Sequence, residues 1–366
     1  MIMNKAENNL LIAASGTGGH IFPALTIADE ISDYWDITWL GIKNRCEEDL
    51  VPKKYSLFLL DFETPSKKNI FLLLQYLRII FAFFRVLKII NKRKISLILT
   101  TGGYISAPTI IAAKISNTPI IIHESNLEPG LVTKYFGRLC DFVFIGFKDT
   151  DKYLSQCRTF YTGTPLRQQF YTSNKLPDWV PNNDEPLILI MGGSQGARGI
   201  NQMLYYSLDF LLEKNIRIVH IIGNNENIDL NSKKNKNYIR RRFINNIAAL
   251  MQNCDLVISR SGAGAINELI YTQKPSILIP FPNSKNNHQE KNALILSSVG
   301  GAIIINQKLN ANIFLKDTLE RIFRNERDNK SKFEILQIMQ KNMLSLDKDI
   351  PQKKIIRILN QFRNDL

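Results

Sequence analysis

The sequence predicts an α/β protein built from two doubly wound, Rossmann-like domains that face a central cleft. Short apolar runs with strand character alternate with helical patterns in the first half, and the alternation restarts at residue 187. Three strands run into glycine-rich turns, AASGTGGHIFPA (13–24), LTTGGYISAP (99–108) and LIMGGSQGAR (189–198). Such alternation predicts parallel sheets covered on both faces, with the turns gathered at the carboxyl edges of the strands.

The first domain is expected to span residues 1–170. Its strands are expected at 10–14, 37–40, 57–61, 97–100, 120–123, 142–145 and 159–162. Helices are expected between them at 23–32, near Glu47, at 69–94, from Pro108 and near 132–139.

A polar, proline-bearing segment at 171–186 predicts the linker to the second domain, which is expected at 187–345. Strands are expected there at 187–191, 216–222, 255–259, 276–280 and 302–305. The remaining residues, 346–366, predict a C-terminal helix that packs back on the first domain.

The glycine-rich turns indicate a phosphate or sugar ligand, because backbone N–H groups at a helix start can face an anion. A dinucleotide fingerprint needs a third glycine where His20 and Ile21 stand, and no turn continues into the Gly-Lys-Ser/Thr of a P-loop. His20 is instead a side chain that can accept a proton near neutral pH. The first turn is therefore a candidate catalytic site; the alternative is a purely structural turn.

Composition favours a soluble globular enzyme. Of the 366 residues, 45% are hydrophobic and 22% are charged. The four cysteines lie far apart without a C-x-x-C pair, which argues against a zinc site or a disulfide framework and for a reducing cytoplasm. The polar start of the chain predicts no secretory signal.

The protein has a net charge of +14, and within residues 1–180 the positive charge is concentrated locally, because residues 64–95 carry eight basic side chains and no acid. The same stretch is the most apolar of the chain. A membrane span would put strands of one sheet on opposite sides of a bilayer, so we expect an amphipathic helix that lies on an anionic membrane surface. The membrane-associating residues would be Ile70, Leu73, Leu77, Phe81, Phe83 and Phe84, with Arg78, Arg85 and Lys88 as the cations. The alternative is an unusually apolar buried helix.

The motif DLVISRSGAGAINELI (255–270) is the sharpest in the second half. A strand ends at Ser259, a glycine-rich turn supplies N–H groups, and Glu268 follows within the helix. A carboxylate there can accept both hydroxyls of a ribose while the helix start faces a diphosphate. Otherwise Glu268 is an acid that the helix dipole favours.

Three other features carry less weight. Asp149-Thr150-Asp151 spells the D-x-D of metal-dependent sugar transferases, but its position before DKYL is typical of a helix cap, so no metal site is predicted. The basic run 233–242 is expected to be a solvated loop and strand edge. His123 is ambiguous, whereas His220 in IVHIIG is expected to be a hydrogen-bonded core histidine.

Taken together, GTGGHIFPA, GGYISAP, HESN, GTPLR, GGSQGAR, RSGAGAINE and NNHQEKNA resemble the MurG family of peptidoglycan glycosyltransferases, in this order and spacing. The resemblance runs from about residue 10 to 345. It implies the GT-B fold of glycosyltransferase family 28. Departures include Gly264 and Ala265 where Leu and Thr often occur, Thr164 in place of Asn and Ala107 in place of Gly, so any side-chain hydrogen bond from residue 265 is lost.

The resemblance implies transfer of N-acetylglucosamine from UDP-N-acetylglucosamine to the C4 hydroxyl of lipid-linked N-acetylmuramyl-pentapeptide (lipid I to lipid II). The first domain would bind the acceptor and the second the UDP-sugar. His20 would be the general base, Glu268 the ribose ligand, and the backbone of Ile244 the reader of uracil. The implied substrate-binding residues are Thr17, Gly18, Gly19, Asn126, Arg167, Ser194, Gln195, Ile244, Ala263, Gly264, Ala265, Glu268, His288 and Gln289.

The resemblance further implies that no cofactor is required and that the protein works as a peripheral protein at the cytoplasmic face of the bacterial cell membrane, in cell-wall synthesis. Partners would be the two substrates, an anionic membrane surface and other cell-wall synthesis proteins, and no nucleic acid. Two alternatives remain open. One is another GT-B enzyme, such as a glycolipid synthase or a UDP-N-acetylglucosamine 2-epimerase, and the other is a non-catalytic, membrane-associated nucleotide-binding module.

Overall fold

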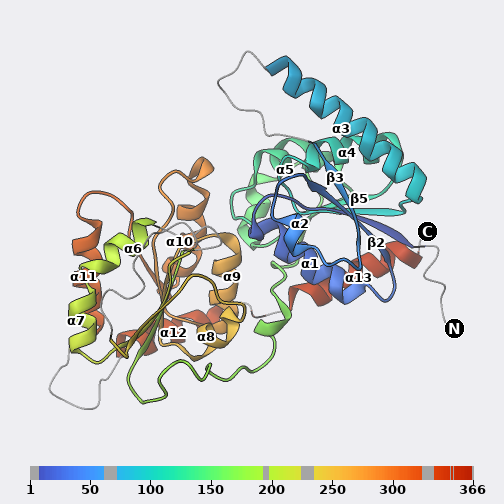
Figure 1. Ribbon diagram of the computed structural model, residues 1–366. Coiled ribbons are helices and arrows are strands. Elements are labelled where there is room, and N and C mark those ends of the chain that lie inside the picture. Colours follow the sequence, from blue (N-terminus) through green and yellow to red (C-terminus); the bar gives the residue numbers. More distant parts are fainter. Residues whose placement is uncertain are drawn as a thin grey trace. The chain divides into compact units, whose positions relative to one another are not determined.

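The structure of the protein is a computed structural model that describes residues 8–61, 72–192, 198–223, 235–323, 334–346, 348 and 350–364 (Figure 1). The chain forms two compact units. Unit 1 comprises the described residues up to Arg167 and those after Lys348, and unit 2 runs from Gln168 to Lys348. Each unit is built around one parallel sheet, in agreement with the predicted fold class.

Within the described residues, unit 1 has a seven-stranded sheet in the order β3-β2-β1-β4-β5-β6-β7, in which every neighbouring pair is parallel. The strands are β1 (Asn9–Ala13), β2 (Asp36–Ile42), β3 (Ser56–Leu60), β4 (Leu97–Thr100), β5 (Ile120–Glu124), β6 (Phe142–Ile145) and β7 (Thr159–Tyr161). The helices are α1 (Gly18–Ile31), α2 (Glu47–Leu50), α3 (Leu72–Arg93), α4 (Ser106–Ile115), α5 (Leu131–Phe136) and α13 (Pro351–Asn364), with 3-10 turns at Gly137–Leu139 and Lys148–Tyr153.

Helices cover both faces of this sheet (Figure 1). On one face, α3, α4 and α5 share an apolar core with the strands, to which α3 contributes Val86 and Ile90. On the other face lie α1 and α13, and α13 buries Ile355 and Leu359 completely. The C-terminal helix therefore belongs to the core of unit 1, although the whole of unit 2, from Gln168 to Lys348, precedes it in the chain.

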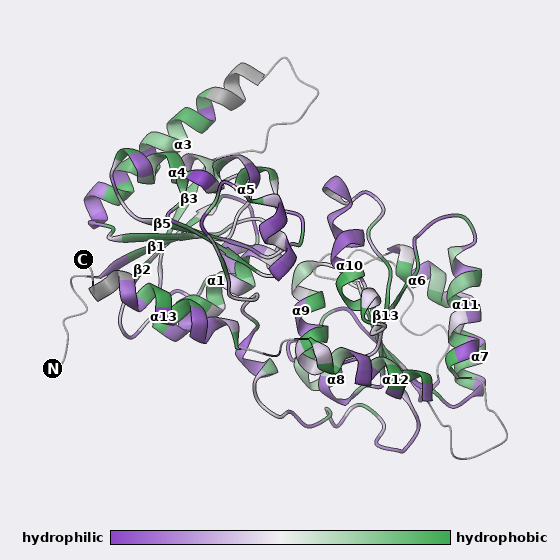
Figure 2. Cartoon of the chain, turned by 180° about the vertical axis from the view of Figure 1, so that it is seen from behind, coloured by the Kyte–Doolittle hydropathy of each residue, from purple (hydrophilic) through white to green (hydrophobic). Residues whose placement is uncertain are grey.

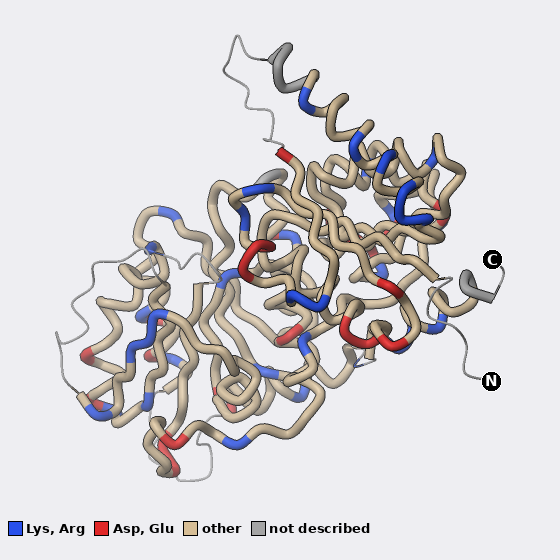
Figure 3. Tube along the Cα trace, turned by 45° about the vertical axis from the view of Figure 1, so that its right-hand side comes forward, with Lys and Arg blue, Asp and Glu red and all other residues tan. Residues whose placement is uncertain are grey.

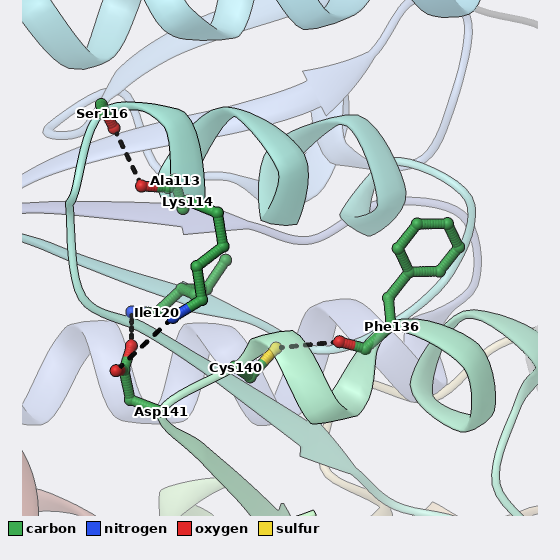
Figure 4. Close-up of polar contacts among 7 residues, drawn as sticks. All are labelled: Ala113, Lys114, Ser116, Ile120, Phe136, Cys140 and Asp141. Atoms are coloured by element: carbon green, nitrogen blue, oxygen red, sulfur yellow. Dashed lines mark hydrogen bonds and ion pairs between the residues drawn. The ribbon is translucent and has the colours of Figure 1, made fainter.

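The carboxylate of Asp141 links the amino ends of the neighbouring strands β5 and β6 (Figure 4). Asp141 accepts a hydrogen bond from the backbone N–H of Ile120 (2.8 Å), at the start of the neighbouring strand β5. The ammonium of Lys114, in the last turn of α4, lies 3.8 Å from the other oxygen of Asp141. This contact lies at the edge of the sheet opposite to the glycine-rich loops, which follow the carboxyl ends of β1 and β4.

The described part of unit 2 has a six-stranded parallel sheet in the order β10-β9-β8-β11-β12-β13. The strands are β8 (Leu187–Met191), β9 (Arg217–Ile221), β10 (Tyr238–Arg241), β11 (Leu256–Ser259), β12 (Ser276–Leu278) and β13 (Ala302–Ile304). The helices are α6 (Arg198–Tyr205), α7 (Leu208–Glu213), α8 (Ile247–Asn253), α9 (Ala263–Thr272), α10 (His288–Ser298), α11 (Ala311–Ile322) and α12 (Glu334–Asn342), with 3-10 turns at Gln168–Phe170, Lys285–Asn287 and Met343–Ser345. The helices α6, α7, α11 and α12 share one core, and α8, α9 and α10 lie on the other side of the sheet (Figure 1).

Residues 171–186, expected as a linker, lie within unit 2. Arg217 at the start of β9 donates to the carbonyls of Glu185 (2.8 Å) and Pro181 (2.6 Å). The guanidinium of Arg241 stacks over the ring of Trp179, 5.0 Å from its centroid. These contacts attach a segment of loop composition to the second sheet, so the division between the units falls at Arg167 and Gln168.

Two helices begin earlier than expected. The helix placed at Pro23 begins at Gly18, and the helix placed at Pro108 begins at Ser106. The carbonyl of Thr17 accepts hydrogen bonds from the N–H groups of His20 (3.0 Å) and Ile21 (3.2 Å), which makes the glycine-rich segment the first turn of α1. Proline favours the first helical position but also fits later in the first turns, so it marks the start of a helix only approximately.

His220 is a hydrogen-bonded core histidine, as predicted. Its Nε2 lies 2.8 Å from Oδ1 of Asn201 on α6, and its Nδ1 lies 2.9 Å from the hydroxyl of Tyr238 on β10. Because Nδ2 of Asn201 donates to the carbonyl of Ile222, Oδ1 is the acceptor and Nε2 of His220 carries the proton. Burial lowers the pKa of His220 to about 3, so the ring is neutral in the folded protein.

His220 makes the stability of the protein depend on pH. Its pKa rises from about 3 in the folded state to the ordinary value of 6.5 on unfolding, so below pH 6.5 the unfolded chain binds the extra proton. When the pH falls from 7 to 5, we expect the free energy of unfolding of the wild type to decrease by about 2 kcal/mol more than that of His220→Gln. Urea unfolding of both proteins at each pH measures this difference. Parallel stability profiles for the two proteins would contradict this assignment.

Candidate functional site

Both sheets have a topological switch point, where the chain order of the strands reverses. In unit 1 it lies between β1 and β4, and in unit 2 between β8 and β11. Loops that leave the carboxyl ends of these strands diverge there, which is where open α/β sheets bind ligands. The motif-bearing loops predicted from the sequence follow these strands: residues 14–17 after β1 (loop 1), residues 101–105 after β4 (loop 2) and residues 260–262 after β11.

His20 connects loop 1 to loop 2. It lies in the first turn of α1, and its Nδ1 is 2.6 Å from the carbonyl oxygen of Thr101. A carbonyl can only accept a hydrogen bond, so Nδ1 carries the proton and Nε2 keeps its lone pair. Gly102 lies against the ring with φ +88°, a conformation that suits glycine. The imidazole is thus held in the tautomer that a general base requires.

Phe22 and Arg167 extend the site along α1. The guanidinium of Arg167, the last residue of the GTPLR motif, lies 5.2 Å from the centroid of the Phe22 ring. Gly18 packs so closely on the same ring that an added Cβ would come within 2.8 Å of it. Glycine at residue 18 therefore lets an aromatic ring support both loop 1 and the cation expected to contact a diphosphate.

The HESN turn after β5 is organised by the buried carboxylate of Glu124. One of its oxygens accepts from the backbone N–H and the side-chain amide of Asn126, both at 3.0 Å. The other accepts from the N–H of Gly130 (2.9 Å) and the hydroxyl of Thr133 (2.7 Å). The amide nitrogen of Asn126, a predicted substrate contact, is thus bonded to Glu124.

His123, which the sequence left ambiguous, has a structural position. It is completely buried, its Nε2 donates to the carbonyl of Gly163 (2.9 Å), and its Nδ1 accepts from the hydroxyl of Ser125 (3.3 Å). Burial lowers the pKa of His123, which keeps the ring neutral. This histidine links the HESN turn to the turn that carries Arg167.

In unit 2, the RSGAGAINE motif forms the start of α9. Ala263, Gly264 and Ala265 are its first helical residues, and Gly262 precedes them without a side-chain cap. An added Cβ at Gly262 or Gly264 would meet no atom within 4 Å, so a ligand has room to approach the backbone. Glu268 is half-buried in the second turn of the helix.

Arg260 and Gln289 connect this motif to the next loops. The buried Arg260 donates to the carbonyls of Ile279 (3.0 Å) and Pro280 (3.1 Å), at the end of β12, and burial lowers its pKa to about 10. The side-chain oxygen of Gln289 accepts from the N–H of Phe281 (2.9 Å), which leaves its amide nitrogen as the end that can donate. The predicted sugar reader is therefore held in one orientation.

The other predicted substrate residues are placed as follows. His288 is the first residue of α10, and Ile244 lies half-buried in the loop between β10 and α8. Thr17, the last residue of loop 1, and Gly19, in the first turn of α1, are exposed. Ser194 and Gln195 lie outside the described residues.

The helix α3 exposes an apolar stripe, formed by Leu77, Ile80, Phe81 and Phe84. The cations Arg78, Arg85 and Lys88 are exposed on the same helix. Phe83 differs from its expected membrane-facing position, because it is half-buried against the core of unit 1. Ile70 and the side chain of Leu73 lie outside the described part of the chain. No helix of the described residues has the length and apolarity that a bilayer span needs.

The Asp149-Thr150-Asp151 sequence lies inside the 3-10 turn Lys148–Tyr153, rather than as the cap before it. Asp149 pairs with Lys152 at 2.6 Å, and Asp151 accepts a hydrogen bond from the hydroxyl of Thr159. Over the ranges that the structure describes, no three His, Cys, Asp or Glu side chains gather as metal ligands.

The sequence analysis did not identify Phe22, Glu124 and Arg260 as functional residues. In the structure they contact Arg167, the HESN turn and the loop after β12, respectively. Two of them carried a signal. Glu124 and Arg260 are charged residues at the ends of the mainly apolar runs 120–124 and 256–260, where a buried charge must find hydrogen-bond partners.

The chain is similar to known glycosyltransferases along almost its whole length. The model of the glycosyltransferase family 28 N-terminal domain matches residues 10–145, and that of the C-terminal domain of the same family matches residues 187–347. Curated relatives include the UDP-N-acetylglucosamine–N-acetylmuramyl-(pentapeptide) pyrophosphoryl-undecaprenol N-acetylglucosamine transferases of Prochlorococcus marinus strains MIT 9515 and MED4. Each relative is 58% identical to this chain, and each alignment covers 98% of this chain and 99% of the relative.

Among solved structures, the crystal structure of Acinetobacter baumannii MurG aligns with a TM-score of 0.75 and 22% identity, covering 97% of this chain and 99% of that one. At 22% identity, this similarity shows that the two proteins share a fold. The shared fold is GT-B, in agreement with the two doubly wound units.

Glu124 should be the most sensitive polar residue of the HESN turn. Glu124→Ala leaves buried donors without an acceptor, and we expect it to lower the free energy of unfolding of unit 1 by about 2 to 4 kcal/mol, measured by urea titration. Glu124→Gln should lower the free energy of unfolding by less than Glu124→Ala, because its remaining oxygen can still accept from Asn126. Only the side that faces the N–H of Gly130 would lose its acceptor. Glu30→Ala, which removes an exposed carboxylate of α1, is the control. Equal effects of all three variants would refute the network.

Proposed function

The chain belongs to glycosyltransferase family 28, and from this we propose that it transfers N-acetylglucosamine from UDP-N-acetylglucosamine to the C4 hydroxyl of lipid-linked N-acetylmuramyl-pentapeptide. The product is the disaccharide lipid used in peptidoglycan synthesis. The observation that carries the assignment to named residues is the hydrogen bond from His20 Nδ1 to the Thr101 carbonyl, which holds a basic nitrogen at the switch point of unit 1.

The reaction is a single displacement. The C4 oxygen of the acceptor attacks the anomeric carbon of the donor, the bond from that carbon to the UDP oxygen breaks, and Nε2 of His20 takes the hydroxyl proton. The resulting imidazolium is stabilised by the Thr101 carbonyl, which accepts from the opposite nitrogen. Displacement from the far side inverts an α-linked donor to a β-linked product.

Unit 2 binds the nucleotide-sugar. Glu268 accepts hydrogen bonds from the ribose hydroxyls, the backbone of Ile244 reads uracil, and the N–H groups at residues 263–265 face the diphosphate. Gln289, held by Phe281, donates from its amide to a sugar hydroxyl. Gln195 and His288 are further proposed contacts to the substrate. Ser194 is the proposed contact to a phosphate oxygen from unit 2, and Arg167 is the proposed phosphate contact from unit 1.

Transfer requires no cofactor. Negative charge develops on the departing UDP, and preorganised dipoles can stabilise such charge without a metal ion. The groups available are the N–H groups of Thr17, Gly18 and Gly19, the start of α9, and Arg167, whose planar fork matches a phosphate.

The helix α3 attaches unit 1 to the cytoplasmic face of the membrane. Along the described part of α3, green hydrophobic and purple hydrophilic segments alternate in Figure 2, and blue Lys and Arg positions recur in Figure 3. Phe81 and Phe84 are 71% and 59% exposed, which is unusual for neighbouring aromatic rings in contact with water alone. Apolar rings that enter the interface and cations that face anionic head groups give peripheral binding and bring the enzyme to its lipid acceptor.

One assay tests the proposed activity. Labelled UDP-N-acetylglucosamine is incubated with muramyl-pentapeptide lipid, and a β-linked disaccharide lipid is the expected product. Release of N-acetylmannosamine from donor alone would indicate a 2-epimerase, and UDP binding without turnover would indicate a non-catalytic module.

His20→Ala should lower turnover by about 10² to 10⁴, the usual contribution of a general base, while UDP binding to unit 2 stays near the wild-type value. Turnover is measured with saturating substrates, and binding by calorimetry with UDP. Near-normal turnover of the variant would exclude His20 as the base.

Phe81→Ser combined with Phe84→Ser should weaken binding to anionic vesicles and reduce turnover with a long-chain acceptor, but spare a short-chain, soluble acceptor. Each ring buried in the interface contributes about 1.5 to 3 kcal/mol. Phe83→Ser is the contrasting variant, since it should destabilise the core of unit 1. Wild-type vesicle binding by the double variant would contradict the assignment of α3.

A further inference from the structure

Glu47 is a buried carboxylate behind loop 1 for which the proposed reaction has no role. It is the first residue of the short helix α2 and is completely shielded from solvent. Its Oε1 accepts from the backbone N–H of Ile42 at 2.7 Å, and its Oε2 accepts from the backbone N–H of Gly16 at 3.4 Å. The side chain therefore joins the carboxyl end of β2 to loop 1, which follows the neighbouring strand β1.

The surroundings are shaped to admit this side chain. A Cβ added to Gly41, in β2, would lie 2.6 Å from Cγ of Glu47, so a larger residue there would displace the carboxylate. Gly16 has φ +105°, and an added Cβ would meet nothing within 4 Å, so backbone conformation rather than space restricts this position. Loop 1 thus makes its sharp turn at the residue that Glu47 holds.

Only a carboxylate satisfies both contacts. The two partners are backbone N–H groups, which can only donate, and an ionised carboxylate has an acceptor oxygen for each. A glutamine would keep one oxygen for Ile42 but would present an NH₂ group to the N–H of Gly16. The contact to loop 1 is therefore specific to the charged residue.

The turn at Gly16 determines where His20 lies. The carbonyl of Thr17, the next residue, accepts from the N–H of His20 and starts α1, so a shift at Gly16 moves the first helical turn. The hydrogen bond from His20 to Thr101 is short, 2.6 Å, and lies in that turn. A displacement of loop 1 would misalign Nε2 without removing it.

We propose that Glu47 is a positioning residue for transfer, which acts by fixing loop 1 at Gly16 and thereby the imidazole of His20. The proposal rests on the proposed function of His20 as the general base. Glu47 touches neither substrate, and its contribution belongs to the turnover step rather than to binding of the nucleotide-sugar.

The test is a double-mutant cycle with Glu47→Gln and His20→Ala in the full-length protein. Glu47→Gln alone should lower kcat by about 10- to 100-fold with the KM for UDP-N-acetylglucosamine unchanged, as small misplacements of catalytic groups do. In the His20→Ala background the same change should have little further effect, because the group that it positions is gone.

Glu48→Gln is the matched control. Glu48 is the next residue of α2, and its carboxylate accepts from the N–H of Asn44 (2.5 Å), at an exposed site that does not reach loop 1. Its kcat should equal that of the wild type. Glu47→Asp keeps the charge on a shorter side chain, so it should fall between the wild type and Glu47→Gln, and it serves as the test variant if Glu47→Gln does not fold.

Wild-type kcat in both Glu47 variants would overturn the proposal, as would an equal loss with and without His20, since that result indicates general damage to unit 1. A wild-type enzyme without transfer activity, or a His20→Ala variant with normal turnover, would instead show that the proposed function fails, and the positioning role would fall with it.

Discussion

The pairing of β1 with β4 is the constraint on which the candidate site of unit 1 depends. Paired residues of these strands are 87 positions apart in the chain, yet the strands are neighbours at the centre of the sheet, with Leu10 opposite Leu97 and Ala13 opposite Thr100. Because both strands are parallel and end at the same level, loop 1 and loop 2 leave the sheet side by side. The bond between His20 and the Thr101 carbonyl follows from that register, and a slip of one residue would remove it.

Buried hydrogen-bond acceptors organise the loops around this register. Glu47 holds loop 1, Glu124 holds the HESN turn, and the carbonyl of Gly163 is held by His123. Each group lies in a dry environment where its hydrogen bonds are strong and where the loss of one partner is costly. In unit 2, Arg260 performs a similar task as a donor to two carbonyls at the end of β12. Rigid loops can thus be built from glycine-rich segments that have little packing of their own.

The fold class and the positions of the strands could be predicted from the sequence, because a buried parallel strand is a short apolar run with a turn at its end. Strands β4, β6 and β8 have the predicted bounds. The predicted helix starts were less accurate than the predicted strand bounds, because proline at residues 23 and 108 indicates the first turns of a helix but not its first residue. The place of residues 171–186 could not be predicted, because their attachment depends on Arg217 and Arg241, far along the chain.

The motifs of the candidate site could be predicted from the sequence, but the hydrogen bonds that join them could not. Alternation and glycine placement identified the loops and His20, whereas the partner of His20 is a backbone carbonyl that no side-chain pattern reveals. Phe83 was assigned to the membrane because every aromatic ring of an apolar helix looks alike in the sequence. Its half-buried position follows from the side of α3 that faces the sheet, where Ala82 and Val86 are buried.

The position of the proton on the His20 ring is the most direct test of its proposed role as the general base. That role requires Nε2 to be unprotonated, so that it can accept the proton of the acceptor hydroxyl. Nitrogen-15 NMR of the protein labelled at histidine distinguishes the two neutral tautomers, with His20→Gln identifying the signals of this residue. The hydrogen bond to Thr101 predicts that the neutral ring carries its proton on Nδ1 and none on Nε2. A ring protonated on Nε2 would contradict the account, since that nitrogen could not then accept a proton from the acceptor hydroxyl.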